Sequence, residues 1–524
     1  MKIARHLLSC LLGLAPSILV AAEKPNIIII YADDIGYGDF SCYGEKGVST
    51  PNIDAIARQG VRHMSGYSAA ATCTPSRYSL LVGEYAFRNK EAAILPGNAP
   101  LIMDTSRPSL ASFLRDNGYA TGLVGKWHLG LGAADQPLDW NAEIKPGPTE
   151  VGFDESFYMA ATADRVPSVF INNGRVVNLD PKDPITVNYE KMVGDWPTGI
   201  SHPQLLKVQA DEQHSGTIVN GVSRIGFMTG GKSALFKDED MADTYLKKAQ
   251  EFISTHAQNV DKGLSKPFFL YYAPNENHVP RVVHQRFQGS TGLGPRGDAV
   301  AAFDWCIGAL VKTLKAKGIY ENTLIVISSD NGPVLFDGYW DGAIEKAGNH
   351  KAGGIWRGGK YSRWEAGTRV PFIVSWPNKV KAGVSDALVS QVDLFASFAE
   401  MIGVKVPKNA AVDSENVLPA LLGHSQTGRD YVIQEALTQI AVRKGNWKYL
   451  PSGSIKDRGD IGDWIETEVG DQGFLFNLRE DPNERHNVAG LYPEIVAEMN
   501  AIIRKVAPEK ASGAKNINKK QLGF

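Results

Sequence analysis

The side chains best suited to chemistry gather in a few short segments of this chain. Two segments are oxygen-rich pairs, Asp33-Asp34 and Asp330-Asn331, which offer the hard oxygen ligands that Ca²⁺ binds. The basic candidates are Lys126, His128, His278 and Lys360. Oxygen ligands for a cation, together with several cationic side chains, indicate chemistry on an anionic substrate.

Each oxygen pair also has a plainer explanation, because Asp and Asn are common in turns and helix caps. Two such pairs, each directly after an apolar run, favour a ligand role instead. The sequence has no cluster of thiolates and no His-x-x-x-His spacing, so calcium is favoured over zinc. Magnesium stays open, although it usually retains more water in its shell.

Cys73 opens the run Cys-Thr-Pro-Ser-Arg, which predicts the start of a helix because Pro75 suits a first turn and Gly83 an end. A helix N-terminus favours a negative charge on the cysteine or on an anion beside it. Arg77 follows at i+4 and therefore lies on the same helix face. An isolated cysteine here would be a buried or disulfide-bonded residue, but this one lies among the other candidates.

The elements that must position these side chains are apolar runs, continuous rather than alternating, which predict strands buried on both faces. The runs cover residues 26–32, 120–124, 267–273 and 323–329. Helix patterns at 51–59 and 108–115 alternate with them. This order predicts an α/β fold with a mostly parallel sheet between helices. The candidate residues follow the carboxyl ends of the strands, where open α/β sheets bind ligands.

The rest of the chain predicts smaller elements. Residues 131–265 are rich in Gly, Pro, Asn and Asp, so we expect loops and short elements around the crevice. From about residue 425, alternating segments predict a small antiparallel sheet, followed by a helix near 493–505. We expect a catalytic domain over 23–425, a C-terminal subdomain over 426–507 and a polar tail over 508–524.

Charge and targeting signals narrow the class of protein. Lys and Arg total 55 against 57 Asp and Glu, so no global basic field would attract nucleic acid or an anionic membrane. Residues 1–22 predict a secretory signal peptide and hence a periplasmic or secreted protein. Pro16 interrupts their short apolar run, which disfavours a membrane anchor. Whether Cys42 and Cys306 pair is left open.

The run Cys-Thr-Pro-Ser-Arg resembles the C-x-P-x-R signature of the type I, formylglycine-dependent sulfatases. Further matches are YADDIGYGD (31–39), GKWHLG (125–130), NHVP (277–280), SSDNGP (328–333) and GGKYSRWEAGTRVP (358–371). The resemblance covers almost the whole mature chain. It implies an alkaline-phosphatase-like fold in which a large, mostly parallel sheet is sandwiched by helices, with a small C-terminal α+β subdomain.

The same resemblance implies the cofactors and the role of each residue. Cys73 would be converted to 3-oxoalanine (formylglycine) by a formylglycine-generating enzyme, and the hydrated aldehyde would be the nucleophile. One Ca²⁺ would be held by Asp33, Asp34, Asp330, Asn331 and residue 73. Arg77 and Lys126 would hold the aldehyde diol, and Lys126 also the sulfate. His128 would accept a proton from the covalent sulfate ester, while His278 and Lys360 would contact the sulfate and protonate the leaving alcohol.

The resemblance implies a sulfuric ester hydrolase, and the loops suggest its substrate. Cationic loop residues, which could bind further sulfates or carboxylates, are Arg165, Arg281, His350 and Arg357. We expect a sulfated polysaccharide or oligosaccharide, and residues 215–245 resemble bacterial sulfatases of algal galactans such as carrageenan. The alternatives are a phosphate or phosphonate ester hydrolase of the same architecture and an exported glycan-binding protein with an inactive site.

Overall fold

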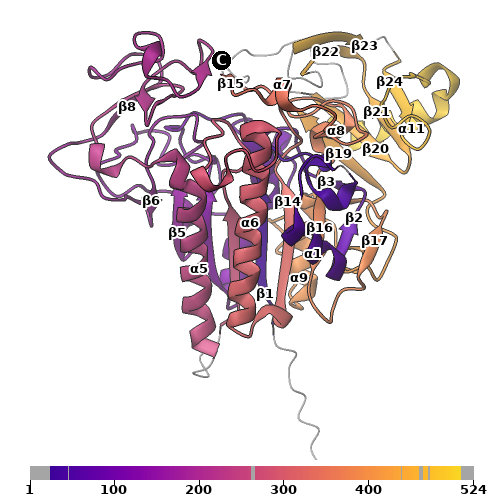
Figure 1. The fold of residues 1–524 in the computed structure, drawn as a ribbon. Coiled ribbons are helices and arrows are strands. Elements are labelled where there is room, and N and C mark those ends of the chain that lie inside the picture. The colour runs from indigo at the N-terminus through magenta and orange to yellow at the C-terminus, as the bar shows by residue number, and fades with distance from the viewer. Residues whose placement is uncertain are drawn as a thin grey trace, which may run out of the picture.

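The computed structural model describes residues 24–44, 46–260, 266–437, 439–458, 464–469 and 472–508. Within these residues the central sheet has ten strands in the order β17-β2-β16-β14-β1-β13-β4-β5-β6-β7 (Figure 1). Their bounds are β1 Asn26–Ala32, β2 Val61–His63, β4 Ala120–Lys126, β5 Glu155–Met159, β6 Ile171–Asn172, β7 Arg175–Val176, β13 Phe268–Ala273, β14 Thr323–Ser329, β16 Phe372–Ser375 and β17 Gly383–Ser385. The consecutive strands β14, β1, β13, β4 and β5 are parallel, which confirms the predicted fold class.

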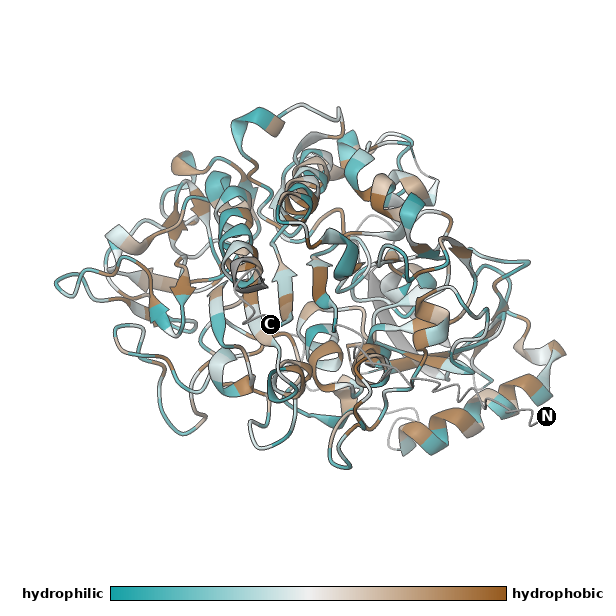
Figure 2. Cartoon of the chain, turned by 90° about the horizontal axis from the view of Figure 1, so that it is seen from below, coloured by the Kyte–Doolittle hydropathy of each residue, from teal (hydrophilic) through white to brown (hydrophobic). Residues whose placement is uncertain are grey.

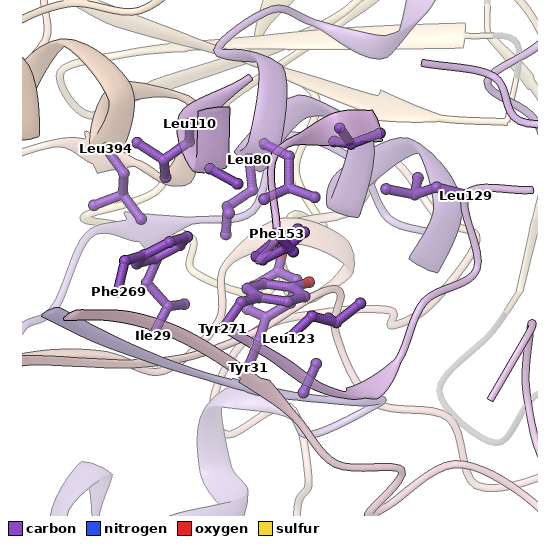
Figure 3. Packing of buried hydrophobic residues seen from close by; sticks show 14 of the residues in the cluster. Ile29, Tyr31, Leu80, Leu110, Leu123, Leu129, Phe153, Phe269, Tyr271 and Leu394 are labelled. Carbon is purple, nitrogen blue, oxygen red and sulfur yellow. The ribbon is translucent and has the colours of Figure 1, made fainter. Parts of the chain in front are cut away.

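The central strand β1 explains why the sheet is covered on both faces. Its side chains alternate between two buried clusters, with Ile27, Ile29 and Tyr31 in one and Ile28, Ile30 and Ala32 in the other. Figure 3 shows Ile29 and Tyr31 packed against Phe269 and Tyr271 of β13 and the leucines above them. A strand buried on both faces cannot alternate apolar with polar residues, so its sequence is one continuous apolar run.

Helices cover the sheet on both sides. The clusters place α1, α5 and α6 on one face and α2, α3 and α9 on the other. The helix bounds are α1 Pro51–Gln59, α2 Cys73–Val82, α3 Leu110–Asp116, α4 Pro148–Val151, α5 Met241–Val260, α6 Gly294–Ala316, α7 Ala343–Lys346, α8 Glu365–Thr368, α9 Leu394–Met401, α10 Leu418–Leu421 and α11 Pro493–Val506. The helices that lie along the sheet contain both hydrophobic and hydrophilic residues, as is typical of helices with one buried side (Figure 2).

The expectation of only loops and short elements over 131–265 was wrong for α5. Tyr245, Ala249 and Ile253 of this helix are fully buried against the sheet and α6. Loops and short elements do occupy the remaining described stretch, and it contains five short strands outside the central sheet. They are β8 Thr186–Asn188, β9 Gln209–Ala210, β10 Ile218–Val219, β11 Val222–Ser223 and β12 Phe227–Thr229. Two more small pairs involve β3 Gly66–Tyr67 with β18 Val389–Ser390, and β15 Tyr339–Trp340 with β9.

The C-terminal subdomain contains a four-stranded antiparallel sheet in the order β19-β20-β21-β24, which α11 covers. Its strands are β19 Tyr431–Ala436, β20 Gln439–Lys444, β21 Trp447–Leu450 and β24 Phe474–Asn477, with a separate hairpin of β22 Gly453–Arg458 and β23 Trp464–Val469. The predicted antiparallel sheet and final helix are therefore confirmed.

A buried carboxylate fastens this subdomain to the catalytic domain. Glu365, at the start of α8, is fully buried and lies 3.1 Å from Lys448 Nζ and 3.5 Å from Arg443 Nη1. Arg369 adds a third contact at 3.3 Å. Burial alone would raise the pKa of Glu365, but Lys448, Arg443 and Arg369 outweigh it and lower the pKa to about 2. Glu365 is therefore the charged centre of the junction.

The described helices include none that is long and apolar enough to cross a membrane. The predicted signal peptide and nearly all of the polar tail lie outside the described residues. Cys42, Cys73 and Cys306 are free thiols in the described chain.

We predict that Glu365→Gln lowers the free energy of unfolding by about 3–5 kcal/mol, because Arg443 would keep a buried charge without a carboxylate and Lys448 would keep only the more distant Glu484, at 3.8 Å. Denaturant unfolding measures the loss. Glu143→Gln is the control, since Glu143 forms only exposed ion pairs, and it should change the midpoint little. Equal midpoints for both variants would contradict the role of Glu365.

Candidate active site

Four adjacent parallel strands bring the predicted segments to one edge of the sheet. Asp330 follows β14, Asp33 follows β1, His278 lies in the loop after β13, and Lys126 ends β4. The register pairs Ala32 with Ser329, so the two acidic segments leave their strands side by side. The sheet thus explains why residues about 300 positions apart in sequence meet.

Three ion pairs, all fully or almost fully buried, form the centre of the cluster. Lys126 Nζ lies 2.7 Å from Asp33 Oδ2, Arg77 Nη2 lies 2.7 Å from Asp330 Oδ2, and Lys360 Nζ lies 2.9 Å from Asp34 Oδ2. Arg77 therefore contacts a carboxylate here rather than Cys73. The matched pairs allow six charges to exist away from water.

The oxygen ligands fit a divalent cation. An oxygen or nitrogen of Asp33, Asp34 and His278 and the Cys73 sulfur lie within 4.8 Å of one another. Burial and the charge of Asp330 raise the pKa of Asp33, although Lys126 opposes them. Asn331 Nδ2 donates to Asp34 Oδ1 at 2.8 Å, which leaves the buried Asn331 Oδ1 without a partner. A cation would stabilise the charged forms of Asp33 and Asp34, and the free Asn331 Oδ1 could coordinate it.

The thiol of Cys73 is not activated as it stands. Cys73 begins α2 as predicted, and its sulfur lies 3.9 Å from Asp33 Oδ1. Burial raises the pKa of the Cys73 thiol to about 12, although Lys126 and Lys360 oppose the shift. Burial therefore outweighs the two cations, and the unmodified residue is a neutral thiol.

His128 is prepared to accept a proton. Its Nε2 lies 2.9 Å from the carbonyl oxygen of Leu95 and must donate to it, so Nδ1 carries the lone pair. That Nδ1 is buried and has no partner. Burial, with help from Lys126 and Arg165, holds the pKa of His128 well below its usual range. The ring is therefore neutral, as a proton acceptor must be.

His278 and Lys360 both approach Asp34 Oδ2. His278 Nδ1 donates to the Val279 carbonyl at 2.7 Å, and Nε2 lies 3.8 Å from Asp34 Oδ2. Burial, with Lys360 adding to it, lowers the pKa of His278 to about 4. Burial would lower the pKa of Lys360 too, but Asp34 and neighbouring acids raise it well above its usual value. Lys360 is therefore a permanent cation.

Sequence reasoning missed Asp337, which is a second carboxylate partner of Lys360, and Tyr361, which contacts Asp337. Asp337 Oδ2 lies 3.0 Å from Lys360 Nζ, and the Tyr361 hydroxyl donates to the same carboxylate at 3.1 Å. Tyr361 also has a φ of 72°, a left-handed conformation that bulky residues rarely adopt. Only the position of Tyr361 next to Lys360 could have drawn attention to it.

Two more residues at the site are left-handed, Asp34 with φ 58° and His128 with φ 57°. His128 lies beyond β4, which ends at Lys126, and Trp127 between them is fully buried. Backbone strain of this kind persists where the surroundings fix a side chain in place.

The four predicted substrate contacts divide into two groups. Arg165 is close enough to Cys73 and His128 to affect their charge, and Asp164 and Thr162 hold it at 2.8 and 2.7 Å. Arg281, in contrast, pairs with Asp341 at 2.8 Å and donates to the carbonyls of Asn277, Val334 and Leu335. It therefore braces the loop that carries His278.

His350 and Arg357 have protein partners of their own. His350 Nε2 lies 2.9 Å from Asp39, which also pairs with Arg296, and only 3% of the His350 side chain is exposed. Arg357 lies 3.7 Å above the Trp364 ring and donates to the Glu484 carbonyl at 3.0 Å. The structure therefore does not favour the substrate contacts that nearness to Lys360 in the sequence suggested.

Known proteins are similar to this chain in sequence and in fold. A sequence model of the family described as Sulfatase matches residues 25–404. An N-acetylgalactosamine-6-O-sulfatase of Bacteroides thetaiotaomicron is 49% identical over 488 residues, 93% of each chain. A solved structure from work on glycosaminoglycan metabolism by the same organism has a TM-score of 0.87 and 49% identity, covering 92% of this chain and 99% of that one. This likeness confirms the predicted alkaline-phosphatase-like fold.

A second similar structure contains a bound saccharide. A crystal structure of a protein in complex with k-i-k-neocarrahexaose has a TM-score of 0.67 and 26% identity. It covers 95% of this chain and 96% of that one.

We predict that Ca²⁺ raises the thermal unfolding midpoint of chelator-treated protein and that Asn331→Ala removes most of this shift. Free Ca²⁺ at a hundred times its dissociation constant would stabilise the wild type by about 2.7 kcal/mol. Asn322→Ala is the control, because Asn322 lies at the opposite end of β14 and should keep the full shift. If Ca²⁺ does not change the thermal unfolding midpoint of the wild type, the assignment of a calcium site is wrong.

Proposed function

The chain belongs to the sulfatase family and is a sulfuric ester hydrolase, and from this premise we propose that it removes 6-O-sulfate from a galactose-type amino sugar of a sulfated glycan. The observation that carries the reaction is the buried cluster in which Arg77, Lys126 and Lys360 surround Cys73 and the oxygen ligands. The observation that supports the sugar is the 49% identity to an N-acetylgalactosamine-6-O-sulfatase.

We propose that Cys73 is converted to formylglycine by a formylglycine-generating enzyme. Formylglycine supplies a nucleophilic oxygen once its aldehyde is hydrated. The unmodified thiol is a weak nucleophile at neutral pH because burial raises its pKa to about 12, and this supports the conversion. The cation, which we propose to be one Ca²⁺ held by Asp33, Asp34, Asp330, Asn331 and residue 73, would stabilise charge on the sulfate.

The roles of the surrounding side chains follow from their atoms. Lys126 and Arg77 hold Asp33 and Asp330 in place and add positive charge next to residue 73. His128 accepts a proton at Nδ1, its only free nitrogen, when sulfate leaves. A positioned general base of this kind contributes about a hundredfold to ten-thousandfold in rate.

His278 and Lys360 serve the leaving group. Nδ1 of His278 is committed to the Val279 carbonyl, so Nε2 is the atom that delivers a proton to the leaving oxygen. A bound anionic ester would favour the protonated ring and offset the effect of burial. Lys360 keeps its charge and stabilises the negative charge that develops on the same oxygen.

Two alternatives have weaker support. A phosphate monoester hydrolase of this architecture usually needs a second metal, and the described residues contain one candidate metal group. An inactive glycan-binding protein has no need for Cys73, Arg77, Lys126 and His128 together in one buried cluster. A sulfated galactan such as carrageenan stays the second candidate substrate, and the structure with a bound neocarrahexaose supports it. We further propose that Arg165 contacts the saccharide and that the protein is exported to the periplasm or secreted.

We predict that the enzyme releases sulfate from a 6-O-sulfated N-acetylgalactosamine disaccharide faster than from its 4-O-sulfated isomer or from carrageenan oligosaccharides. Ion chromatography of released sulfate measures the rates, with Cys73→Ala as the inactive control. Preference for the 4-O-sulfate would contradict the position, and preference for carrageenan would favour the galactan.

We also predict an aldehyde at position 73 when the full chain is coexpressed with a formylglycine-generating enzyme. Mass spectrometry of the tryptic peptide that ends at Arg77 detects it. The matched control is the same chain expressed without that enzyme. An active preparation that contains only unmodified cysteine would refute the proposed nucleophile.

A further inference from the structure

We propose that Phe336 and Trp340 form a stacking surface for a saccharide ring on the leaving-group side of the site. The inference rests on the proposed function and deepens it, because it names the residues that recognise the sugar rather than the sulfate. Both aromatics belong to residues 334–341, which we call the 334–341 loop. This loop follows β14 and Asn331 on the edge of the sheet that carries the site (Figure 1).

The first observation is that the 334–341 loop contacts Lys360. Asp337, next to Phe336 in the chain, lies 3.0 Å from Lys360 Nζ, and Lys360 in turn lies 2.9 Å from Asp34. Lys360 faces the leaving oxygen in the proposed reaction. Phe336 is therefore one residue away from a carboxylate that contacts Lys360, so the aromatic pair lies close to the group that we propose stabilises the leaving oxygen.

The exposure of Trp340 carries the second step. Its side chain is 57% exposed, whereas the preceding Tyr339 is 1% exposed. The Trp340 and Phe336 rings lie 5.4 Å apart at 44°, so they form one continuous apolar surface. A single exposed apolar residue needs no explanation, but a paired one beside a buried charged cluster is typical of a ligand site.

The loop is rigid, which is the third step. The Tyr339 hydroxyl donates to the Ser223 carbonyl at 2.7 Å, and β15 pairs with β9. Arg281 binds the carbonyls of Val334 and Leu335 and pairs with Asp341. Because the loop is already ordered, a sugar can stack on Trp340 without the entropic cost of fixing a mobile loop.

The chemistry of a pyranose matches this surface. One face of a galactose-type ring is lined by C–H groups and packs on aromatic rings, while its hydroxyls need polar partners. Mostly aromatic walls with a few fixed polar groups are what small-ligand sites use for orientation. Asp337 follows Phe336 in the chain, and its carboxylate accepts a hydrogen bond from the Tyr361 hydroxyl, so polar atoms of this kind are present in the same loop.

The test compares Trp340→Ala with Trp305→Ala. Trp305 is also exposed, at 41%, but it lies on α6 against Phe287 and Arg286. We expect Trp340→Ala to raise KM for the sulfated disaccharide about tenfold with kcat unchanged, because stacking binds ground state and transition state alike. Inhibition by the desulfated disaccharide should weaken by a similar factor, while inhibition by inorganic sulfate stays the same. Trp305→Ala should change none of these values.

The outcomes separate the two proposals. If the wild type hydrolyses the disaccharide and Trp340→Ala behaves like Trp305→Ala, the stacking surface is overturned and the proposed function stands. If Trp340→Ala lowers kcat on p-nitrophenyl sulfate as well, the loop only supports Lys360, which also overturns the proposal. If the wild type cleaves p-nitrophenyl sulfate but neither cleaves nor binds any of the saccharides, the glycan function fails and the stacking surface with it.

Discussion

The structure depends on keeping three carboxylates and three cations paired where water cannot reach them. Asp33, Asp34 and Asp330 supply the negative charge, and each has its own cation within 3 Å. Removing one partner of such a buried pair typically costs about 3–5 kcal/mol, so no member is free to change alone. The parallel strands β14, β1 and β4 bring the acids and Lys126 to one edge, while Arg77 reaches it from α2 and Lys360 from the segment before α8.

The pairing also explains the chemistry of the site. The cations that stabilise the carboxylates in the resting protein are the same groups that can stabilise charge on a sulfate ester during reaction. His128 differs from the other basic groups, since burial among cations keeps it neutral and its Nδ1 is left open.

Much of the fold and of the candidate site could be predicted from sequence because both depend on local patterns. The continuous run at 323–329 became β14 with the same bounds, and the polar residues after it lie at the site. The helix α5 was missed because the Gly- and Pro-rich stretch before it masked its buried positions. Asp337 had no recognisable pattern, since one acid in a loop is ordinary until Lys360 approaches it in space. His350 shows the limit of sequence distance as a guide, since it is near Lys360 in the chain but its Nε2 lies 2.9 Å from Asp39.

The buried contact of Glu365 links the site to residues of the C-terminal subdomain. Lys360 and Glu365 lie on one short segment, and Arg443 and Lys448 of the C-terminal subdomain hold Glu365. The family match ends at residue 404, well before either basic residue. The residues that the family model covers thus exclude Arg443 and Lys448, which hold Glu365 in place. Inherited changes in β20 or β21 can impair turnover without touching any group that meets the substrate.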